Sequence, residues 1–465
     1  MSQQTLSANI IQSRVGKTPL VRARNLEKEL GLKNIFVKLE GNNPSGHRED
    51  RLSRLLIRDA LEVDKQTLCV GSYGVMAESI AFLSSYYDVN CVFIFPEGSS
   101  LNNKEIFEKD NIKIIYHGQT DKEALDYSNQ ISKEKNWYNA NPGIENNVLN
   151  MTALSYITNE LNNQIKEDIT TVFSQMSYGY SITGLHLGFR RLWIDEEINK
   201  IPMLYSCTTD SGNTIFESYK KDSYKILPLD EKDLELDQYN MRLVNLKSSV
   251  AQDALSAIHD TNGKITGVSN DELKKYVDKF KSLENIELGY ENGYSIAAFM
   301  KEAEEGHLTK GNHVILLNDG RSDLELKEMT RQDNVDEEKI IKLIDQWLMD
   351  YTDPKIEIRE ALTNALDEGF VVFAYHNNVF EGIAVITSFG FEHFASKYHL
   401  AYIATNDNVR GRGIATELLS KAIELSKGNL SLHVDIDNDR AIKLYEKMGF
   451  TSSYIRMMYQ LDGDE

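Results

Sequence analysis

The strongest constraint on the fold is an alternation of short apolar strands and amphipathic helices from residue 1 to about 325. The predicted strands are Ile35–Glu40, Leu68–Gly71, Cys91–Phe95, Ile112–Tyr116, Thr171–Ser174, Met203–Tyr205, Tyr224–Leu227 and Val314–Leu317. Apolar residues recur at helical spacing over Leu52–Val63 and Ala77–Tyr86. This alternation predicts an α/β fold with parallel sheets covered on both faces, and its length favours two halves with a cleft between them.

A different pattern follows the charged segment Glu325–Glu338, which we interpret as a linker between domains. The elements predicted beyond it are helix Lys339–Asp350, strands Phe370–His376 and Phe380–Ser388 joined by a turn at Asn377–Asn378, strand Tyr398–Thr405, helix Thr416–Lys427, strand Leu430–Asp435, helix Arg440–Met448 and a strand near Tyr454–Leu461. The sequence therefore predicts two domains, at residues 1–327 and 335–465, and the second is mixed α/β.

Composition narrows the classes of partner. The chain has 51 basic and 71 acidic residues, a net charge of −20, so its field repels nucleic acid and anionic membranes. The three cysteines, Cys69, Cys91 and Cys207, are too few and too scattered for a disulfide framework or a zinc site, and no metal site is predicted. The sequence shows no leader pattern and no apolar run of membrane-spanning length. We expect a cytoplasmic protein that binds small molecules.

The most informative segment near the C-terminus is Val409-Arg410-Gly411-Arg412-Gly413-Ile414-Ala415, between a predicted strand and a predicted helix. Glycines let backbone N–H groups approach a phosphate, and a helix N-terminus favours an anion. With the downstream segment, this region resembles the GCN5-related N-acetyltransferase (GNAT) family. The matching residues are Arg410, Gly413 and Ala415 of the acyl-CoA signature, and Asn438, Ala441, Leu444, Tyr445, Glu446, Gly449 and Phe450 of a second motif.

The resemblance implies acetyl transfer from acetyl-CoA to an amine. Residues 409–415 and Asn438 would bind acetyl-CoA, and Tyr445 would protonate the departing CoA thiolate. The general base stays open: the candidates are His399, Tyr402, Glu392, His393 and His433, or a chain of waters. Strict strand alternation would place His399 and Tyr402 on opposite faces of their strand.

Three segments of the first domain, Gly16–Val21, Val37–Glu40 and Asn43–Gly46, resemble pyridoxal-phosphate enzymes of the tryptophan-synthase-β fold type, also called fold type II. This family includes cysteine synthase and threonine synthase, and its motif continues Asn-Pro-x-Gly-x-x-Lys-Asp-Arg. Here the chain continues His47-Arg48-Glu49-Asp50-Arg51, so Glu49 stands at the position of the lysine that forms the aldimine. A carboxylate cannot form a Schiff base.

Other landmarks of that family also differ. Its Ser/Thr-Gly-Asn loop corresponds to Ser72-Tyr73-Gly74, and its glycine-rich phosphate loop keeps Gly179 and Gly184 but has tyrosines at 178 and 180. Asp319 lies about where the family has a serine or threonine at the pyridine nitrogen. We therefore predict that pyridoxal phosphate is absent and that the domain is a degenerate pseudo-enzyme. The predicted ligand cleft comprises His47, Arg48, Glu49, Ser72, Tyr73, Gly74, Gly179 and Asp319, unless it is vestigial.

Our main hypothesis is a fusion that acetylates a small amine, such as an amino acid, which the first domain binds or presents. A second hypothesis is a regulatory binding protein whose cleft takes a small ligand or a partner synthase. A third, less favoured, is a pyridoxal-phosphate-dependent lyase or synthase of amino acids. The resemblance to enzymes that are often dimers allows a homodimer and leaves the oligomeric state open.

Overall fold

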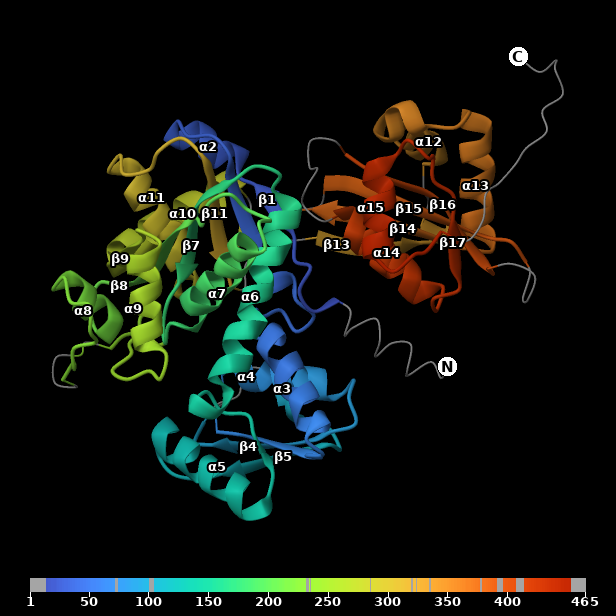
Figure 1. The fold of residues 1–465 in the computed structure, drawn as a ribbon. Coiled ribbons are helices and arrows are strands. Elements are labelled where there is room, and N and C mark those ends of the chain that lie inside the picture. The colour runs from blue at the N-terminus through green and yellow to red at the C-terminus, as the bar shows by residue number, and fades with distance from the viewer. Residues whose placement is uncertain are drawn as a thin grey trace. The chain divides into compact units, whose positions relative to one another are not determined.

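The computed structural model describes residues 14–71, 74–99, 104–230, 234, 236–284, 286–318, 321–322, 324–333, 336–376, 379–390, 396–406 and 414–452. The chain forms two compact units, Met1–Asp323 and Leu324–Glu465 (Figure 1). The predicted α/β class is confirmed in both units.

The first unit contains a large, mostly parallel sheet. Its strand order is β1 (Leu20–Arg22), β2 (Ile35–Leu39), β11 (Asn312–Leu317), β7 (Ile169–Gln175), β8 (Met203–Thr209) and β9 (Lys264–Val268), and only the pairing of β1 with β2 is antiparallel. The helices that belong with this sheet are α2 (Arg24–Leu30), α7 (Tyr180–Ile194), α8 (Thr214–Lys220), α9 (Ala251–Asp260), α10 (Asn270–Glu284) and α11 (Tyr294–Glu304). A short antiparallel pair, β10 (Ile286–Glu287) and β12 (Arg321–Ser322), completes this lobe.

Alternating side chains bury both faces of this sheet. On β11, Ile315 and Leu317 pack in the core beneath α10 and α11, whereas Val314 and Leu316 pack in the core beneath α7 and α9. A strand buried on both faces reads as a continuous apolar run, which is why its sequence was recognisable.

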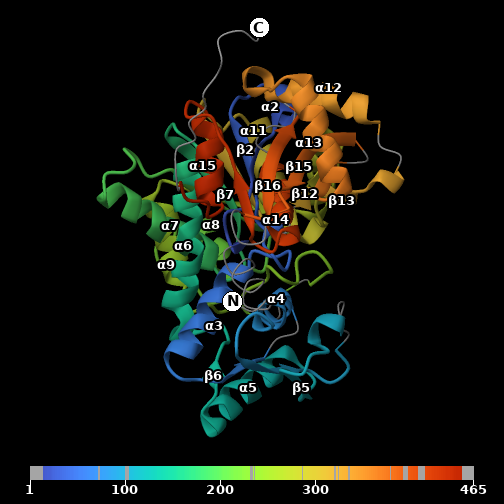
Figure 2. The same cartoon turned by 90° about the vertical axis from the view of Figure 1, so that its right-hand side faces the viewer.

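A smaller, wholly parallel sheet forms the second lobe of this unit. Its order is β5 (Ile112–Tyr116), β4 (Asn90–Phe95), β3 (Thr67–Val70) and β6 (Tyr138–Asn139), with helices α3 (Asp50–Glu62), α4 (Val75–Ser84) and α5 (Asp121–Lys135). The long helix α6 (Asn147–Gln164) packs against α3 and α7 and runs between the two lobes (Figures 1 and 2).

A buried charge network ties the lobes together. The guanidinium of Arg51 on α3 donates to Glu40 at 2.6 Å and to Glu160 on α6 at 2.7 Å. Glu160 also accepts from the Lys38 ammonium at 2.7 Å. Burial alone would raise the pKa of Glu160, but the charges of Arg51 and Lys38 outweigh it and lower that pKa. Gly16 has φ +77°, and a Cβ there would lie 2.7 Å from Glu160 Oε1, so this position requires glycine.

The described residues of the second unit form one sheet of five strands. Its order is β13 (Leu324–Met329), β14 (Phe370–His376), β15 (Val379–Ser388), β16 (Tyr398–Thr405) and β17 (Leu430–Leu432), antiparallel except for β16 with β17. One face packs against α12 (Glu337–Leu348) and α13 (Lys355–Asp367), and the other against α14 (Ile414–Leu425) and α15 (Asp439–Lys447).

Three sequence expectations need correction. The segment Glu325–Glu338 is not a linker throughout, because residues 324–329 form edge strand β13, paired with β14. Alternating Leu324 and Leu326 pack on the sheet core while charged residues face outward, as an edge strand allows.

Tyr224–Leu227 is not a strand; Leu227 instead contacts α8, donating from its N–H to Ser218 and accepting from the hydroxyl of Thr214. Helix α13 was not anticipated. The expected turn at Asn377–Asn378 and the strand near Tyr454–Leu461 lie outside the described residues.

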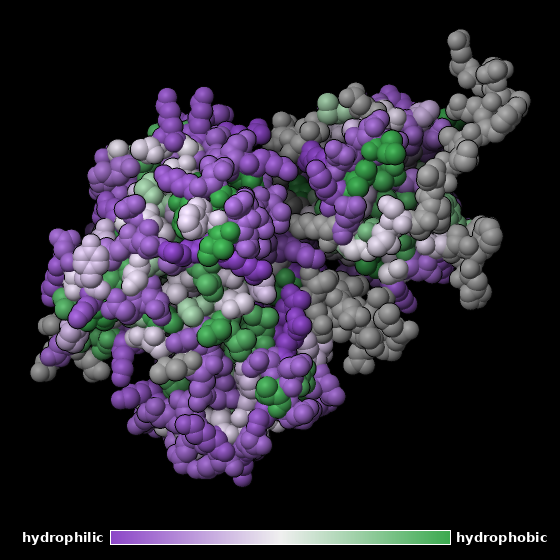
Figure 3. Space-filling view, in the orientation of Figure 1, coloured by the Kyte–Doolittle hydropathy of each residue, from purple (hydrophilic) through white to green (hydrophobic). Residues whose placement is uncertain are grey.

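Figure 3 shows how hydrophilic and apolar residues are distributed over one face of the molecule. The visible face of the first unit is largely hydrophilic, with small apolar patches (Figure 3). Among the helices that the structure describes, none combines the length and the apolar run needed to cross a membrane.

Candidate functional site

In the second unit, the described pairing of β16 with β17 stops where β17 ends. β16 pairs with β17 only from Tyr398 to Leu400, and then continues to Thr405 with β15 as its described partner. A β-bulge between Leu400 and Tyr402 interrupts the pairing with β15. Bulges of this kind occur frequently beside active sites, where they redirect a side chain.

The bulge changes which side chains share a face. Leu400 packs against the α14 side of the sheet, whereas Tyr402, two residues later, packs against the α12 and α13 side. In a regular strand they would face the same way. The expectation that strict alternation separates His399 from Tyr402 is therefore wrong for this strand.

Tyr402 makes one specific contact where the strands separate. Its hydroxyl donates to Asp353 Oδ2 at 2.8 Å, and Asp353 is itself exposed in the segment between α12 and α13. Burial and this hydrogen bond raise the pKa of Tyr402. In the same segment, Tyr351 donates to the backbone oxygen of Asp437, in the loop after β17. Residues 351–353 thus reach both sides of the separation.

Tyr445 lies on α15 and packs in the core with α14. Its side chain is 9% exposed, and burial raises its pKa to about 12. A phenol with this pKa keeps its proton throughout the neutral range, as a proton donor must.

The remaining residues predicted to bind acetyl-CoA are described in part. Ile414 and Ala415 begin α14 directly after β16 and its loop, and Val409, Arg410, Gly411, Arg412 and Gly413 lie outside the described residues. Asn438 caps α15, its side-chain oxygen accepting from Ala441 N at 3.1 Å. Such a cap orders the helix that carries Tyr445.

The other candidate bases differ in setting. His399 Nδ1 lies 3.0 Å from Ser431 Oγ, and its ring stacks on Phe389 and lies beside His433. Glu392 and His393 lie outside the described residues. Sequence reasoning missed Asp353, although an Asp-Pro pair before a helix is a recognisable start signal.

In the first unit, two of the predicted cleft residues, Arg48 and Glu49, lie at the carboxyl ends of β11 and β7. Arg48 Nη1 donates to Ser181 Oγ at 2.6 Å and to Asn318 Oδ1 at 3.0 Å, and its backbone N–H donates to the Asn318 carbonyl. Arg48 Nη2 donates to Glu49 Oε1 at 2.7 Å. Ser181 lies in the first turn of α7, and Asn318 directly follows β11. Sequence reasoning missed Ser181 and Asn318.

The other described residues of the predicted cleft lie in adjoining segments. His47 Nε2 lies 3.5 Å from Glu78 on α4, and Gly74 precedes α4. Gly179 has φ +99°, and a Cβ there would meet Ala254 Cβ at 2.7 Å, so the loop before α7 needs this glycine. Ser72, Tyr73 and Asp319 lie outside the described residues.

Asp50 is the buried anion beside the pair of Arg48 and Glu49. It accepts from the N–H and hydroxyl of Ser45 and from the hydroxyl of Ser79. Burial raises the pKa of Asp50 despite these hydrogen bonds. Its partners fold residues 45–50 tightly at the start of α3.

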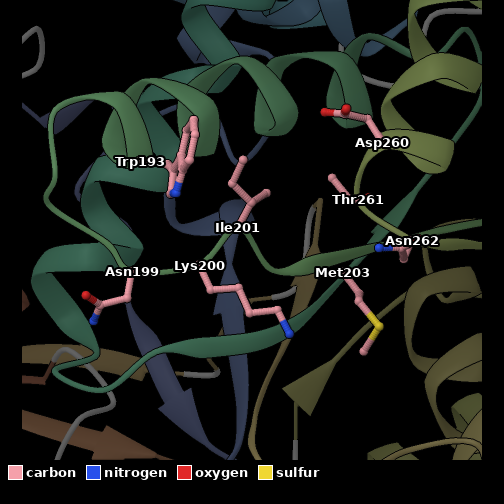
Figure 4. Close-up of a pocket in the computed structure, with 8 residues that line it drawn as sticks. All are labelled: Trp193, Asn199, Lys200, Ile201, Met203, Asp260, Thr261 and Asn262. Atoms are coloured by element: carbon pink, nitrogen blue, oxygen red, sulfur yellow. The ribbon is translucent and has the colours of Figure 1, made fainter.

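Two further features do not belong to these sites. A pocket of about 270 Å³ is lined by Trp193, Asn199, Lys200, Ile201, Met203, Asp260, Thr261 and Asn262, at the amino end of β8 and so at the opposite end of that strand from the cleft (Figure 4). Among the described residues, Glu302, Glu305 and His307 cluster as metal ligands do. The Lys264 ammonium lies 2.7 Å from Glu302 and already neutralises this buried carboxylate.

Comparison with known proteins places both units. A model of the family described as "Pyridoxal-phosphate dependent enzyme" matches residues 11–320, and a model of the "Acetyltransferase (GNAT) family" matches residues 338–450. The predicted resemblance of each part is therefore confirmed.

The curated relatives match the first unit. Threonine synthase of Methanocaldococcus jannaschii is 27% identical over 309 residues, covering 66% of this chain and 74% of the relative. The O-acetylserine dependent cystathionine beta-synthase of Bacillus subtilis is 32% identical over 115 residues, covering 23% and 36%.

Solved structures agree on the fold. Threonine deaminase isoform 2 of Solanum lycopersicum superposes with a TM-score of 0.55 at 16% identity, covering 68% of this chain and 83% of that one. Maize serine racemase gives 0.54 at 15% identity, covering 68% and 94%. The chain belongs to the pyridoxal-phosphate-dependent enzyme family, and an acetyltransferase domain of the GNAT family follows its first unit.

Proposed function

We propose that the protein is an acetyl-CoA-dependent N-acetyltransferase acting on a small amine, such as an amino acid. The observation that carries the proposal is the end of the described β16–β17 pairing at Leu400, which shares a core cluster with α14 and Tyr445. The GNAT match supports the same reaction class.

The edge of strand β16 is where we propose that acetyl-CoA binds. From Ala401 to Thr405, β16 has no described partner on the β17 side, so among the described residues the backbone groups of this edge can bind an extended amide chain such as the pantetheine arm of CoA. The N-terminus of α14, which follows β16, attracts the pyrophosphate. The acetyl group then lies beside the separation of the strands.

The reaction is a direct transfer. The lone pair of the neutral amine attacks the acetyl carbonyl carbon, a C–N bond forms and the C–S bond breaks. The CoA sulfur takes the proton of the Tyr445 hydroxyl, and the nitrogen releases its proton through water, which returns one to Tyr445. Starting from the neutral amine, the overall products are an acetylated amine and CoA thiol, and Tyr445 is regenerated with its proton.

Asp353 is the residue we assign to the acceptor. Its exposed carboxylate attracts an ammonium group, and Tyr402 holds this carboxylate in place through the 2.8 Å hydrogen bond. The raised pKa of Tyr402 argues against Tyr402 itself as the base, because it retains its proton. The general base stays unassigned.

We also propose that the first unit carries out no pyridoxal-phosphate chemistry. The residue at the lysine position is Glu49, whose carboxylate cannot form a Schiff base, and it is paired with Arg48. Lys38 is no substitute, because its ammonium is held by Glu160, Gln164 and the carbonyl of Thr18. The residues present do not fit the cofactor, and we derive no step through it. A ligand role for this unit, a homodimer and a cytoplasmic location stay predictions.

Acetyl-CoA turnover over a panel of amines and amino acids tests the proposed reaction. Wild-type protein is expected to release CoA thiol with at least one amine, and Tyr445→Phe to lower kcat by about 100-fold. Tyr375→Phe is the matched control, since Tyr375 is a half-buried tyrosine of β14. Background turnover across the whole panel contradicts the proposal.

A further inference from the structure

Arg48 connects three segments that are far apart in the sequence. Its side chain leaves the loop before α3, reaches Ser181 in the first turn of α7, and reaches Asn318 at the end of β11. Arg48 and Glu49 are each mostly buried, with side chains 14% and 15% exposed. Together with the backbone bond from Arg48 to Asn318, these contacts close the carboxyl end of the sheet between β11 and α7.

The electrostatics of this arrangement are unusual. The N-terminus of a helix carries partial positive charge and favours anions. Here the first turn of α7 receives a guanidinium, hydrogen-bonded to Ser181 Oγ at 2.6 Å. The carboxylate of Glu49, at 2.7 Å from Arg48 Nη2, offsets the repulsion. Glu49 is the anionic partner of the Arg48 guanidinium, beside the neutral acceptors Ser181 and Asn318.

The two residues also occupy the two positions that a phosphorylated aldehyde cofactor would need. Ser181 belongs to the loop that resembles the phosphate loop, and residue 49 corresponds to the aldimine lysine. A phosphate at α7 would have to displace the Arg48 guanidinium from Ser181. A lysine at position 49 would place an ammonium beside that guanidinium.

We propose that Arg48 and Glu49 form a built-in substitute for the cofactor, which fills its phosphate and lysine positions and joins the segments that the cofactor would join. This inference rests on the proposed absence of pyridoxal-phosphate chemistry and goes beyond it. It states that the lysine replacement alone does not account for the lost site. Restoring the site requires removal of both residues as a pair.

The test uses full-length protein incubated with pyridoxal phosphate, reduced with borohydride and analysed for a phosphopyridoxyl lysine by peptide mass spectrometry. Glu49→Lys alone is expected to lower Tm, because two cations become neighbours, and to trap no cofactor. The double variant Arg48→Ser/Glu49→Lys is expected to recover part of the lost Tm and to trap the cofactor at position 49.

A matched pair controls for charge changes. Arg190 and Asp260 form an exposed ion pair on α7 and α9, so Asp260→Lys and Arg190→Ser/Asp260→Lys make the same changes outside the cleft. These controls are expected to trap no cofactor. Should the double variant at 48 and 49 fail to fold, equilibrium dialysis of Arg48→Ser/Glu49→Gln replaces it, with at least tenfold tighter binding of pyridoxal phosphate than wild type expected.

Each result separates the two proposals. One equivalent of cofactor trapped by wild-type protein at Lys38, in place of scattered labelling of surface lysines, overturns the proposed absence of the chemistry. Equal trapping by Glu49→Lys and the double variant, with none in wild type, overturns only the role of the pair. A folded double variant that traps nothing also overturns it, as does dialysis without a gain in affinity.

Discussion

Polar groups near the ends of parallel strands are paired with one another in the first unit, whereas in the second unit one of them is exposed. In the first unit, Arg48 is bonded to Glu49, Ser181 and Asn318, so the charges at the sheet's carboxyl edge satisfy one another. In the second, β16 runs beyond its pairing with β17, and the exposed carboxylate of Asp353 stands beside that separation. Fold likeness alone does not indicate which unit holds a working site, and our proposals therefore rest on the contacts of individual polar groups.

The largest loss of stability is expected from a substitution in the buried charge network of the first unit. Arg51→Met leaves Glu40 and Glu160 buried without their guanidinium, and should cost about 3–5 kcal/mol of unfolding free energy in that unit. Urea denaturation, followed by a probe for each unit, measures it.

Arg331→Met is the matched control for this change, because Arg331 pairs with Asp367 on the exposed surface of the second unit. It should leave stability near wild type. Equal losses for both variants would contradict the contrast between buried and exposed pairs.

The second unit should respond in substrate binding instead of stability. Asp353→Asn removes the charge that attracts the ammonium, so the KM for the amine should rise about tenfold while the KM for acetyl-CoA stays unchanged. Steady-state kinetics with each substrate varied gives both values. Asp367→Asn, at an exposed ion pair of the same unit, serves as the control. An unchanged KM for the amine would rule out Asp353 as the acceptor residue.

The alkaline stability of the second unit should depend on Tyr445. Below pH ~10 the phenol is protonated in both states, and its burial contributes fully. Between the ordinary value near 10 and the folded pKa of about 12, only the unfolded chain releases the proton. Stability should therefore fall by about 1.4 kcal/mol per pH unit more in wild type than in Tyr445→Phe. Parallel curves for the two proteins would contradict the raised pKa.

The buried strands, the two domains and the departure at position 49 could be predicted from the sequence. The buried strands were readable because they are continuous apolar runs, as in Val314–Leu317, and motifs located both domains. Position 49 was recognised as a departure from the family's pattern because it lies inside a fixed motif.

The features that sequence reasoning missed depend on contacts between residues far apart in the chain or on different strands. Ser181 and Asn318 are 133 and 270 residues from Arg48, and no local pattern pairs them. The bulge at Leu400 and Tyr402 arises from pairing with β15, so alternation read from β16 alone failed there. Edge strand β13 has few buried apolar side chains, and its charges resembled those of a linker.

The smallest expected effect concerns Asn438, which caps α15 and which we also predict to bind acetyl-CoA. Its side chain caps α15, so Asn438→Ala should destabilise the second unit by about 1 kcal/mol. Asn438→Ser keeps a capping oxygen, and the unfolding free energy should return close to wild type. If the Asn438 amide also binds acetyl-CoA, as the family resemblance implies, the serine variant should keep a raised KM for acetyl-CoA. A KM restored together with stability would instead confine Asn438 to capping, and the second unit would then owe its cofactor contacts to β16 and the start of α14.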